Sequence, residues 1–281
     1  MPVVKFIERL DLNQNISFLE NTFTNNTQEP NSTMKLSTAT FGYCKKCAKV
    51  HKLSPGKSIH ACRELMKDFS SNPADNLVAM HEKTREPFAL SELFGPSRGK
   101  MFGVMECLHP DDSITYIKAF SGQLNGIWQV EGWAPPIFDI KQYESTSYDT
   151  EKEIKALGRK IDQYTPHSKD WLMLKKLRRN LSQQLMYKIH NLYRLTNFKG
   201  ETVPLHEAYN GRGGIPAGTG DCCAPKLLNF AARHNLRPTG ISEFYWGKEN
   251  KAATRQHGSF YSSCPEKCQP ILGFLLCGLN D

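Results

Sequence analysis

Cysteine and histidine side chains recur near the start of the chain at spacings that suit a metal ion. Cys44 and Cys47 are separated by two residues, His51 follows four residues later, and Cys62 is the next cysteine. Structural zinc sites are closed by four such thiolate and imidazole ligands. The sequence therefore predicts a zinc ion held by Cys44, Cys47, His51 and Cys62 in a small surface ribbon, with His60 competing for the fourth place.

A second group of residues that could do chemistry lies near the C-terminus. The glycine-rich residues 218–221 lead into Cys222 and Cys223, which begin an expected helix. The partial positive charge at a helix N-terminus favours thiolates. His257 and the Cys264-Pro-Glu-Lys-Cys268 segment follow, and three interpretations of this order stay open.

In the first interpretation the chain carries a cysteine nucleophile. Cys222 or Cys223 would attack the substrate, His257 would be the base, and Glu243 or Asp221 would orient the imidazole. The order of a cysteine at a helix start followed by a later histidine is typical of papain-like and transglutaminase-like enzymes.

In the second interpretation Cys223, Cys264 and Cys268 hold a zinc ion that activates water, as in nucleobase deaminases. Two departures weaken an active deaminase. The cysteine pair is separated by three residues instead of two, and Pro225 occupies the position of the proton-carrying glutamate. In the third interpretation the cysteines form a structural cluster, and Asp221 caps the helix.

The same motifs resemble the N-terminal accessory region of the large RluA-type RNA pseudouridine synthases. The resemblance covers about residues 95–281 and rests on seven segments: 99–104, 119–122, 132–139, 218–228, 242–247, 257–258 and 264–268. It implies an RNA-modification setting. The synthase domain would follow this region, and the sequence ends at Asp281, so we expect no synthase activity from this chain alone.

Charge points to the same class of partner. The formal net charge is +8, which favours acidic partners and structured RNA first. Lysines and arginines on a helix face can neutralise phosphates, and exposed aromatic rings can stack on unpaired bases. The candidate nucleic-acid-binding residues are Lys175, Lys176, Arg178, Arg179, Arg212, Lys226 and Trp246.

Composition also bears on the compartment. The chain has nine cysteines, no apolar run long enough to span a membrane and no secretion signal at its start. Free thiols at metal-like spacing favour a reducing cytoplasm over a disulfide framework.

The expected fold class is α+β, with a mixed or antiparallel sheet, flanking helices and a helical-hairpin insertion. The deaminase interpretation adds a deaminase-like core as one form of it. Residues 101–108 and 114–120 predict a β-hairpin, and leucines at spacings of three and four predict a long helix that ends near 195. The expected divisions are a mobile N-terminal arm (1–40), a zinc knuckle (41–70), a β-rich part (71–149), a helical hairpin (150–197) and a C-terminal Cys/His part (198–281).

Overall fold

The computed structural model describes residues 39–71, 76–77 and 88–279. The predicted N-terminal arm therefore lies almost wholly outside the described residues. Within them, helices and antiparallel strands alternate, and the predicted α+β class is confirmed. No helix in the described part of the chain is both long enough and apolar enough to cross a bilayer.

The centre of the fold is a four-stranded antiparallel sheet in the order β10-β9-β5-β6. Its strands are β5 (Lys100–Leu108), β6 (Ile114–Phe120), β9 (Arg237–Trp246) and β10 (Phe260–Tyr261). The predicted hairpin of β5 and β6 is confirmed. Its turn is closed by Asp111, whose carboxylate accepts hydrogen bonds from the Ser113 backbone and hydroxyl groups.

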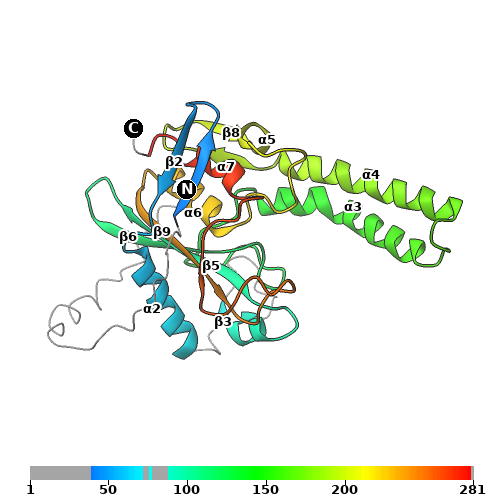
Figure 1. Cartoon of the computed structure of the whole chain (residues 1–281), viewed down its shortest axis with the longest axis horizontal. Coiled ribbons are helices and arrows are strands. Elements are labelled where there is room, and N and C mark those ends of the chain that lie inside the picture. The colour runs from blue at the N-terminus through cyan, green and yellow to red at the C-terminus, as the bar shows by residue number, and fades with distance from the viewer. Residues whose placement is uncertain (1–38, 72–75, 78–87, 280–281) are drawn as a thin grey trace. The chain divides into compact units, whose positions relative to one another are not determined.

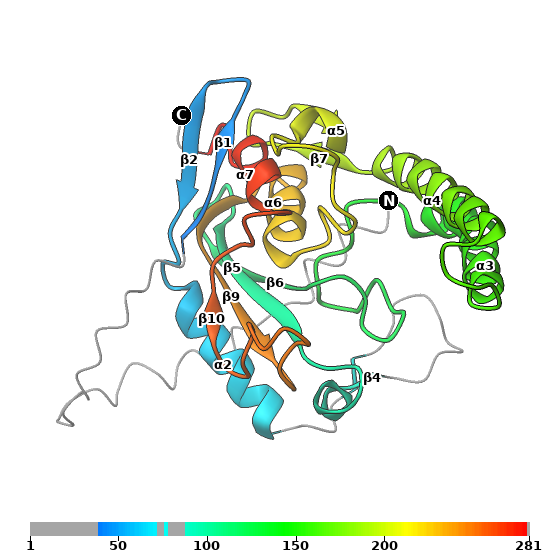
Figure 2. The ribbon, with the colours of Figure 1, turned by 45° about the vertical axis from the view of Figure 1, so that its right-hand side comes forward.

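Alternate side chains of this sheet enter two separate cores. Phe102, Val104 and Phe244 face helix α2 (Ser58–Ser71), whereas Met105 and Ile241 face helix α6 (Cys223–Arg233) and helix α7 (Gln269–Leu275). Figures 1 and 2 show α2 on one side of the sheet and α6 with α7 on the other. The face on which a β9 residue points therefore decides which side chains it can meet.

A second hairpin, formed by β1 (Thr40–Cys44) and β2 (Lys49–Leu53), packs against α7 (Figure 2). The approach is close because glycines meet backbone. A Cβ atom on Gly273 of α7 would overlap the Tyr43 backbone, and one on Gly42 would overlap the backbone of Gly273. This contact fixes the end of α7 beside the β1–β2 turn.

Two long helices form a hairpin that extends away from the sheet (Figure 1). Helix α3 (Ile140–Ile161) is capped by the Asp139 carboxylate, and α4 (Lys169–His190) is capped by the Ser168 hydroxyl. Ser168 follows Pro166, which separates the two helices as predicted. The hairpin begins at Ile140, ten residues before the predicted boundary, because Asp139 ends the extended Pro-rich segment.

Short elements complete the described chain. They are β3 (Asn76–Leu77), β4 (Phe88–Ala89), the 3-10 helix η3 (Leu90–Phe94), β7 (Arg194–Thr196), β8 (Thr202–Pro204) and α5 (Leu205–Ala208).

Candidate metal centres

Four side chains converge at the β1–β2 turn: Cys44 ends β1, Cys47 lies in the turn, His51 lies in β2 and Cys277 follows α7. The ligand atoms of Cys44, Cys47, His51 and Cys277 all lie within 4.8 Å of one another, and we call this group cluster A. The sulfur of Cys47 is 3.0 Å from His51 Nε2 and 3.7 Å from the sulfur of Cys277. Three of the four predicted ligands are thus brought together, in an arrangement that can hold a metal ion.

The fourth predicted ligand was wrong. Cys62 lies on α2, at the opposite face of the central sheet, where its thiol donates to the Ser242 carbonyl oxygen at 3.4 Å. Burial raises the pKa of this thiol to about 12, which keeps it neutral. Cys277 takes its place because the glycine contact between β1 and α7 carries the end of α7 to the turn. No spacing in the sequence signals this ligand.

The turn between Cys44 and His51 is stabilised by its backbone conformation and by an ion pair. Ala48 adopts a left-handed conformation (φ 55°) that closes the knuckle. Lys46 pairs with Glu201 at 3.2 Å. Desolvation raises the pKa of Cys47, but hydrogen bonds with His51 and the Lys49 backbone outweigh it, and the pKa falls to about 7. A thiol with this pKa loses its proton to a metal readily.

A second group contains three thiols and sits where α6 and α7 begin. The sulfurs of Cys222, Cys264 and Cys268 all lie within 4.8 Å of one another, and we call this group cluster B. Cys222 is the N-cap of α6 and Cys268 the N-cap of α7, and neither side chain caps its own helix. Hydrogen bonds with Cys222 and then with Cys268 lower the pKa of Cys264.

The ligand from α6 is therefore Cys222, and the predicted Cys223 was the wrong neighbour. Cys223 is fully buried, and its thiol donates to the Met101 carbonyl oxygen on β5 at 3.3 Å. Burial raises its pKa well above the ordinary value. Adjacent residues at a helix start point about 100° apart, so only one of them can face cluster B.

Glu243 reaches the edge of cluster B from β9. Its side chain is 6% exposed, and Oε1 accepts the Ser263 hydroxyl at 3.0 Å. Burial raises the pKa of the carboxyl to about 7, against the opposing effect of Ser263 and of the Ala224 backbone N–H at the start of α6. Glu243 pairs in register with Gly103, which has no side chain to block the space between the sheet and α6.

Asp221, the residue before Cys222, forms hydrogen bonds with two neighbouring segments. Its carboxylate accepts the Tyr193 hydroxyl at 2.6 Å, and its backbone oxygen accepts the Gly122 N–H at 2.8 Å. Burial raises the pKa of Asp221. The carboxylate is thus hydrogen-bonded to Tyr193, and the structure gives it no contact with His257.

His257 is not part of either cluster. Its ring packs on Trp246 with centroids 4.2 Å apart, and its Nδ1 accepts the Gly247 N–H at 3.2 Å. Trp246 faces α2, on the opposite side of the sheet from cluster B. The predicted cysteine–histidine pair was therefore wrong, because His257 packs on Trp246 on the α2 side of the sheet, whereas Cys222 and Cys223 lie on the α6 side.

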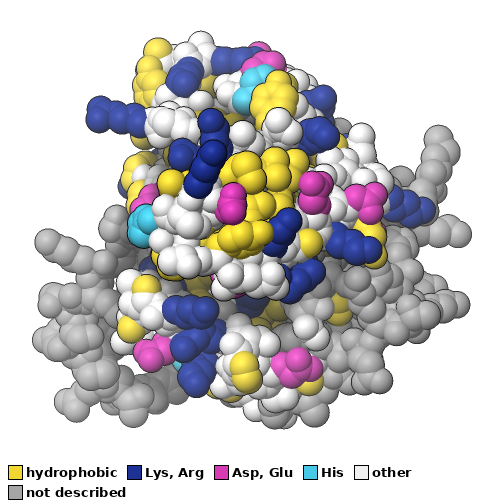
Figure 3. All heavy atoms as spheres, turned by 90° about the vertical axis from the view of Figure 1, so that its right-hand side faces the viewer, with side chains coloured by type: hydrophobic (Ala, Val, Ile, Leu, Met, Phe, Trp, Pro, Cys, Tyr) yellow, Lys and Arg dark blue, Asp and Glu magenta, His cyan; other side chains and the backbone are white. Residues whose placement is uncertain are grey.

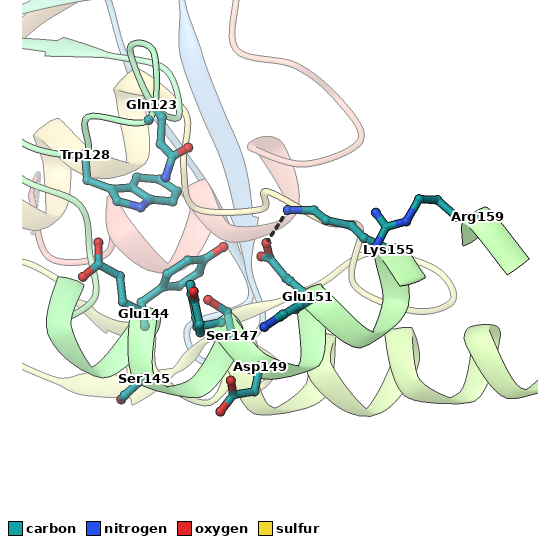
Figure 4. Close-up of a pocket in the computed structure, with 13 residues that line it drawn as sticks. Gln123, Trp128, Glu144, Ser145, Ser147, Asp149, Glu151, Lys155 and Arg159 are labelled. Atoms are coloured by element: carbon teal, nitrogen blue, oxygen red, sulfur yellow. Dashed lines mark ion pairs between the residues drawn. The ribbon is translucent and has the colours of Figure 1, made fainter. Parts of the chain in front are cut away.

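An open groove of about 1010 Å³ lies along α3. Figure 4 shows Gln123 and Trp128 on one wall and Glu144, Glu151 and Lys155 of α3 on the other. Gly122, which precedes Gln123, is the residue bonded to Asp221. This hydrogen bond joins the chain neighbour of Gln123, which lines the groove, to the chain neighbour of Cys222, which belongs to cluster B.

The candidate nucleic-acid-binding residues divide into exposed and buried ones. Lys175, Lys176, Arg178 and Arg179 are exposed on α4 and, with Ser182, line a hollow of about 440 Å³; Arg212 is also exposed. Viewed from the side of the helical hairpin, Lys and Arg side chains are spread over the face around an apolar patch (Figure 3).

Two of those candidates were wrong. Lys226 is 1% exposed and donates to the carbonyl oxygens of Phe120 and Gly122. Trp246 is 5% exposed within the aromatic core under α2. Neither side chain can reach a nucleic acid, because each is buried against the central sheet.

Comparison with known proteins adds no relative to these observations: no family model matches the sequence, and no curated protein or solved structure matches it significantly.

Proposed function

We propose that this protein is a zinc-stabilised RNA-binding module of the cytoplasm, which acts beside RNA-modifying enzymes and binds structured RNA through helix α4. The observation that carries the proposal is the charge of α4. This helix has six lysines and arginines and one acidic residue. Its basic side chains are solvated and extend along an arm that stands away from the sheet (Figure 1).

The arrangement on α4 suits phosphate binding better than an ordinary solvated face. Lys175, Arg178 and Ser182 follow one another at spacings of three and four and so share one side of the helix. Lys175 also lies 4.3 Å from the centroid of the Trp171 ring, which orients its ammonium group. Closely spaced cations release counterions from a nucleic-acid backbone, and this release drives salt-dependent binding.

Zinc is the ion that best suits cluster A. Three thiolates and one imidazole form a complete four-ligand shell, and soft sulfur ligands select zinc among the common divalent ions. All nine cysteines are unpaired, which supports a reducing compartment. The resemblance to the accessory region of RluA-type pseudouridine synthases supports the RNA-modification setting.

The test measures the affinity of the full chain for a labelled transfer RNA transcript as a function of salt. We expect reversal of Lys175, Lys176, Arg178 and Arg179 to glutamate to weaken binding at low salt. The slope of log affinity against log salt should fall by about one for each lost phosphate contact.

The matched control reverses four exposed lysines outside the arm, Lys52, Lys57, Lys248 and Lys251, and changes the net charge by the same amount. It should keep most of the affinity. Equal loss in the two variants would mean that binding follows net charge alone, and no affinity of the wild type at low salt would refute the proposal.

A further inference from the structure

Clusters A and B differ in the number of ligands they offer. Cluster A has four donor atoms, whereas cluster B has three, and within the described residues no further cysteine, histidine or carboxylate joins it. Structural zinc sites close their shell with four protein ligands, but catalytic sites keep three and leave a position for water. A metal ion at cluster B would have this open position.

A carboxylate stands beside the open cluster without belonging to it. Glu243 pairs in register with Gly103, and a Cβ atom on Gly103 would lie 3.4 Å from Glu243 Cγ and 2.8 Å from the Cβ of Cys223, the residue after Cys222. The oxygens of Glu243 fall outside the 4.8 Å group of ligand atoms. A carboxylate at this place is positioned to exchange protons with a water molecule at the fourth site, and not to fill that site.

In the sequence this chemistry was weakened, because Pro225 stands where a glutamate of the helix would be needed. In the fold the carboxylate comes from the strand instead. Ala224, two residues after Cys222, has its N–H beside Glu243. The acidic group thus reaches the first turn of α6 from β9.

We infer that Cys222, Cys264 and Cys268 form a second zinc centre with an open position, and that Glu243 is its proton carrier in the hydrolytic deamination of an amino-substituted heterocycle such as a nucleobase. Zinc at such a site lowers the pKa of the water that it holds. Water adds to the carbon that bears the amino group, the C–N bond breaks and ammonia leaves. Glu243 takes a proton from the water and gives one to the departing nitrogen, so no oxidant or reductant is needed.

Access and substrate class follow from the residues of the site. Cys222 and Cys264 are partly exposed. The substrate class follows from the ligand set, because three thiolates with a separate carboxylate as the proton carrier match the arrangement of zinc-dependent nucleobase deaminases. The inference is independent of RNA binding by α4, because the two use different residues.

The first experiment counts and characterises the metals in the full chain. We expect about two zinc ions per chain in the wild type and one in Cys222→Ala. Cys223→Ala is the matched control, since it removes the neighbouring thiol that lies outside cluster B, and it should keep two. One zinc in the wild type, or two in Cys222→Ala, would overturn the second centre.

Cobalt substitution tests the open position without a substrate. Azide should change the visible absorption of the cobalt-loaded wild type and leave Cys222→Ala, which retains only the closed cluster A, unchanged. Glu243→Gln should keep the cobalt spectrum and bind azide more tightly, because a negative charge is removed. A wild-type spectrum that ignores azide would mean a closed site.

The reaction is tested by ammonia release from cytidine, adenosine and a single-stranded RNA oligonucleotide. At least one of these probes should release ammonia with the zinc-loaded wild type, and Glu243→Gln should lower the rate at least about 100-fold. No release with any probe overturns the deamination, and an unchanged rate in Glu243→Gln overturns the role of the carboxylate. Either result leaves the proposal of RNA binding by α4 unaffected.

Discussion

At the scale of single residues, the direction of a side chain decides its chemistry more than its type. Cys222 and Cys223 are adjacent, yet one lies in cluster B and the other is buried against β5. Lys226 is a lysine like those of α4, but its ammonium group donates hydrogen bonds to two carbonyl oxygens inside the fold. Residue type alone would have given Cys222 the same role as Cys223, and Lys226 the same role as the lysines of α4.

His190 leads to a prediction about pH. Its imidazole is buried near the end of α4, and Nε2 has no hydrogen-bond partner among the described residues. Burial lowers its pKa below the ordinary 6.5. The unfolded chain therefore binds the proton first, and stability is lost as the pH falls through about 6.5 toward the folded pKa.

We expect the free energy of unfolding in urea to fall less between pH 7.5 and pH 5 for His190→Leu than for the wild type. His60→Gln, at an exposed position on α2, is the control and should keep the wild-type pH dependence. An unchanged pH dependence in His190→Leu would contradict the argument.

At the scale of elements, the β1–β2 hairpin and α7 are coupled by backbone contact instead of by large side chains. Gly42 and Gly273 allow this approach, and as a result Cys277 lies beside the ligands of the β1–β2 hairpin. Helix α6 is coupled to β5 in a similar way, since a Cβ atom on Gly103 would lie 2.8 Å from Cys223 Cβ. Close backbone approach at glycine residues therefore positions the segments that carry both clusters.

Gly273→Ala tests this coupling. In an isolated helix, glycine to alanine would stabilise by about 1 kcal/mol. Here the added methyl group overlaps the Tyr43 backbone, so we expect a net loss of about 1–3 kcal/mol and a lower metal content at cluster A. Thermal unfolding and zinc analysis would measure both. Gly214→Ala, where a Cβ atom meets nothing within 4 Å, is the control, and equal stability of the two variants would argue against the coupling.

At the scale of the whole described chain, cluster A joins its two ends. Cys47 and Cys277 are 230 residues apart, and between them lie the central sheet and both of its cores. A metal that binds only the folded chain adds its binding free energy to folding. We therefore expect the stability of the entire fold to depend on a metal ion bound at cluster A.

We expect Cys277→Ser to lose one metal and to unfold more easily by more than about 3 kcal/mol, in the upper range of single substitutions. In a chain of this size, the melting temperature should then fall by at least about 6 °C. A strong chelator should lower the wild-type melting temperature, and added zinc should restore it. Cys62→Ala should keep its metal, whereas a metal-free wild type with unchanged melting would refute the dependence.

Much of the architecture could be read from local patterns. Alternation around the Pro-Asp-Asp turn predicted β5 and β6, and the leucine spacing with Pro166 predicted the long paired helices. The knuckle of Cys44, Cys47 and His51 was also predictable, because all three lie within one β-hairpin whose local geometry brings them together. Patterns of this kind depend on residues close in sequence.

The sequence by itself determined the ligand types, the local hairpins and helices, and the positive charge of α4. Only the tertiary structure decided that Cys277 replaces Cys62, that Cys222 replaces Cys223 and that His257 lies apart from the cysteines. It also placed Glu243 beside cluster B. The physical reason is packing between segments far apart in sequence. It sets the side of the sheet on which Cys62, His257 and Glu243 lie, and it sets which of two adjacent helix residues turns toward cluster B.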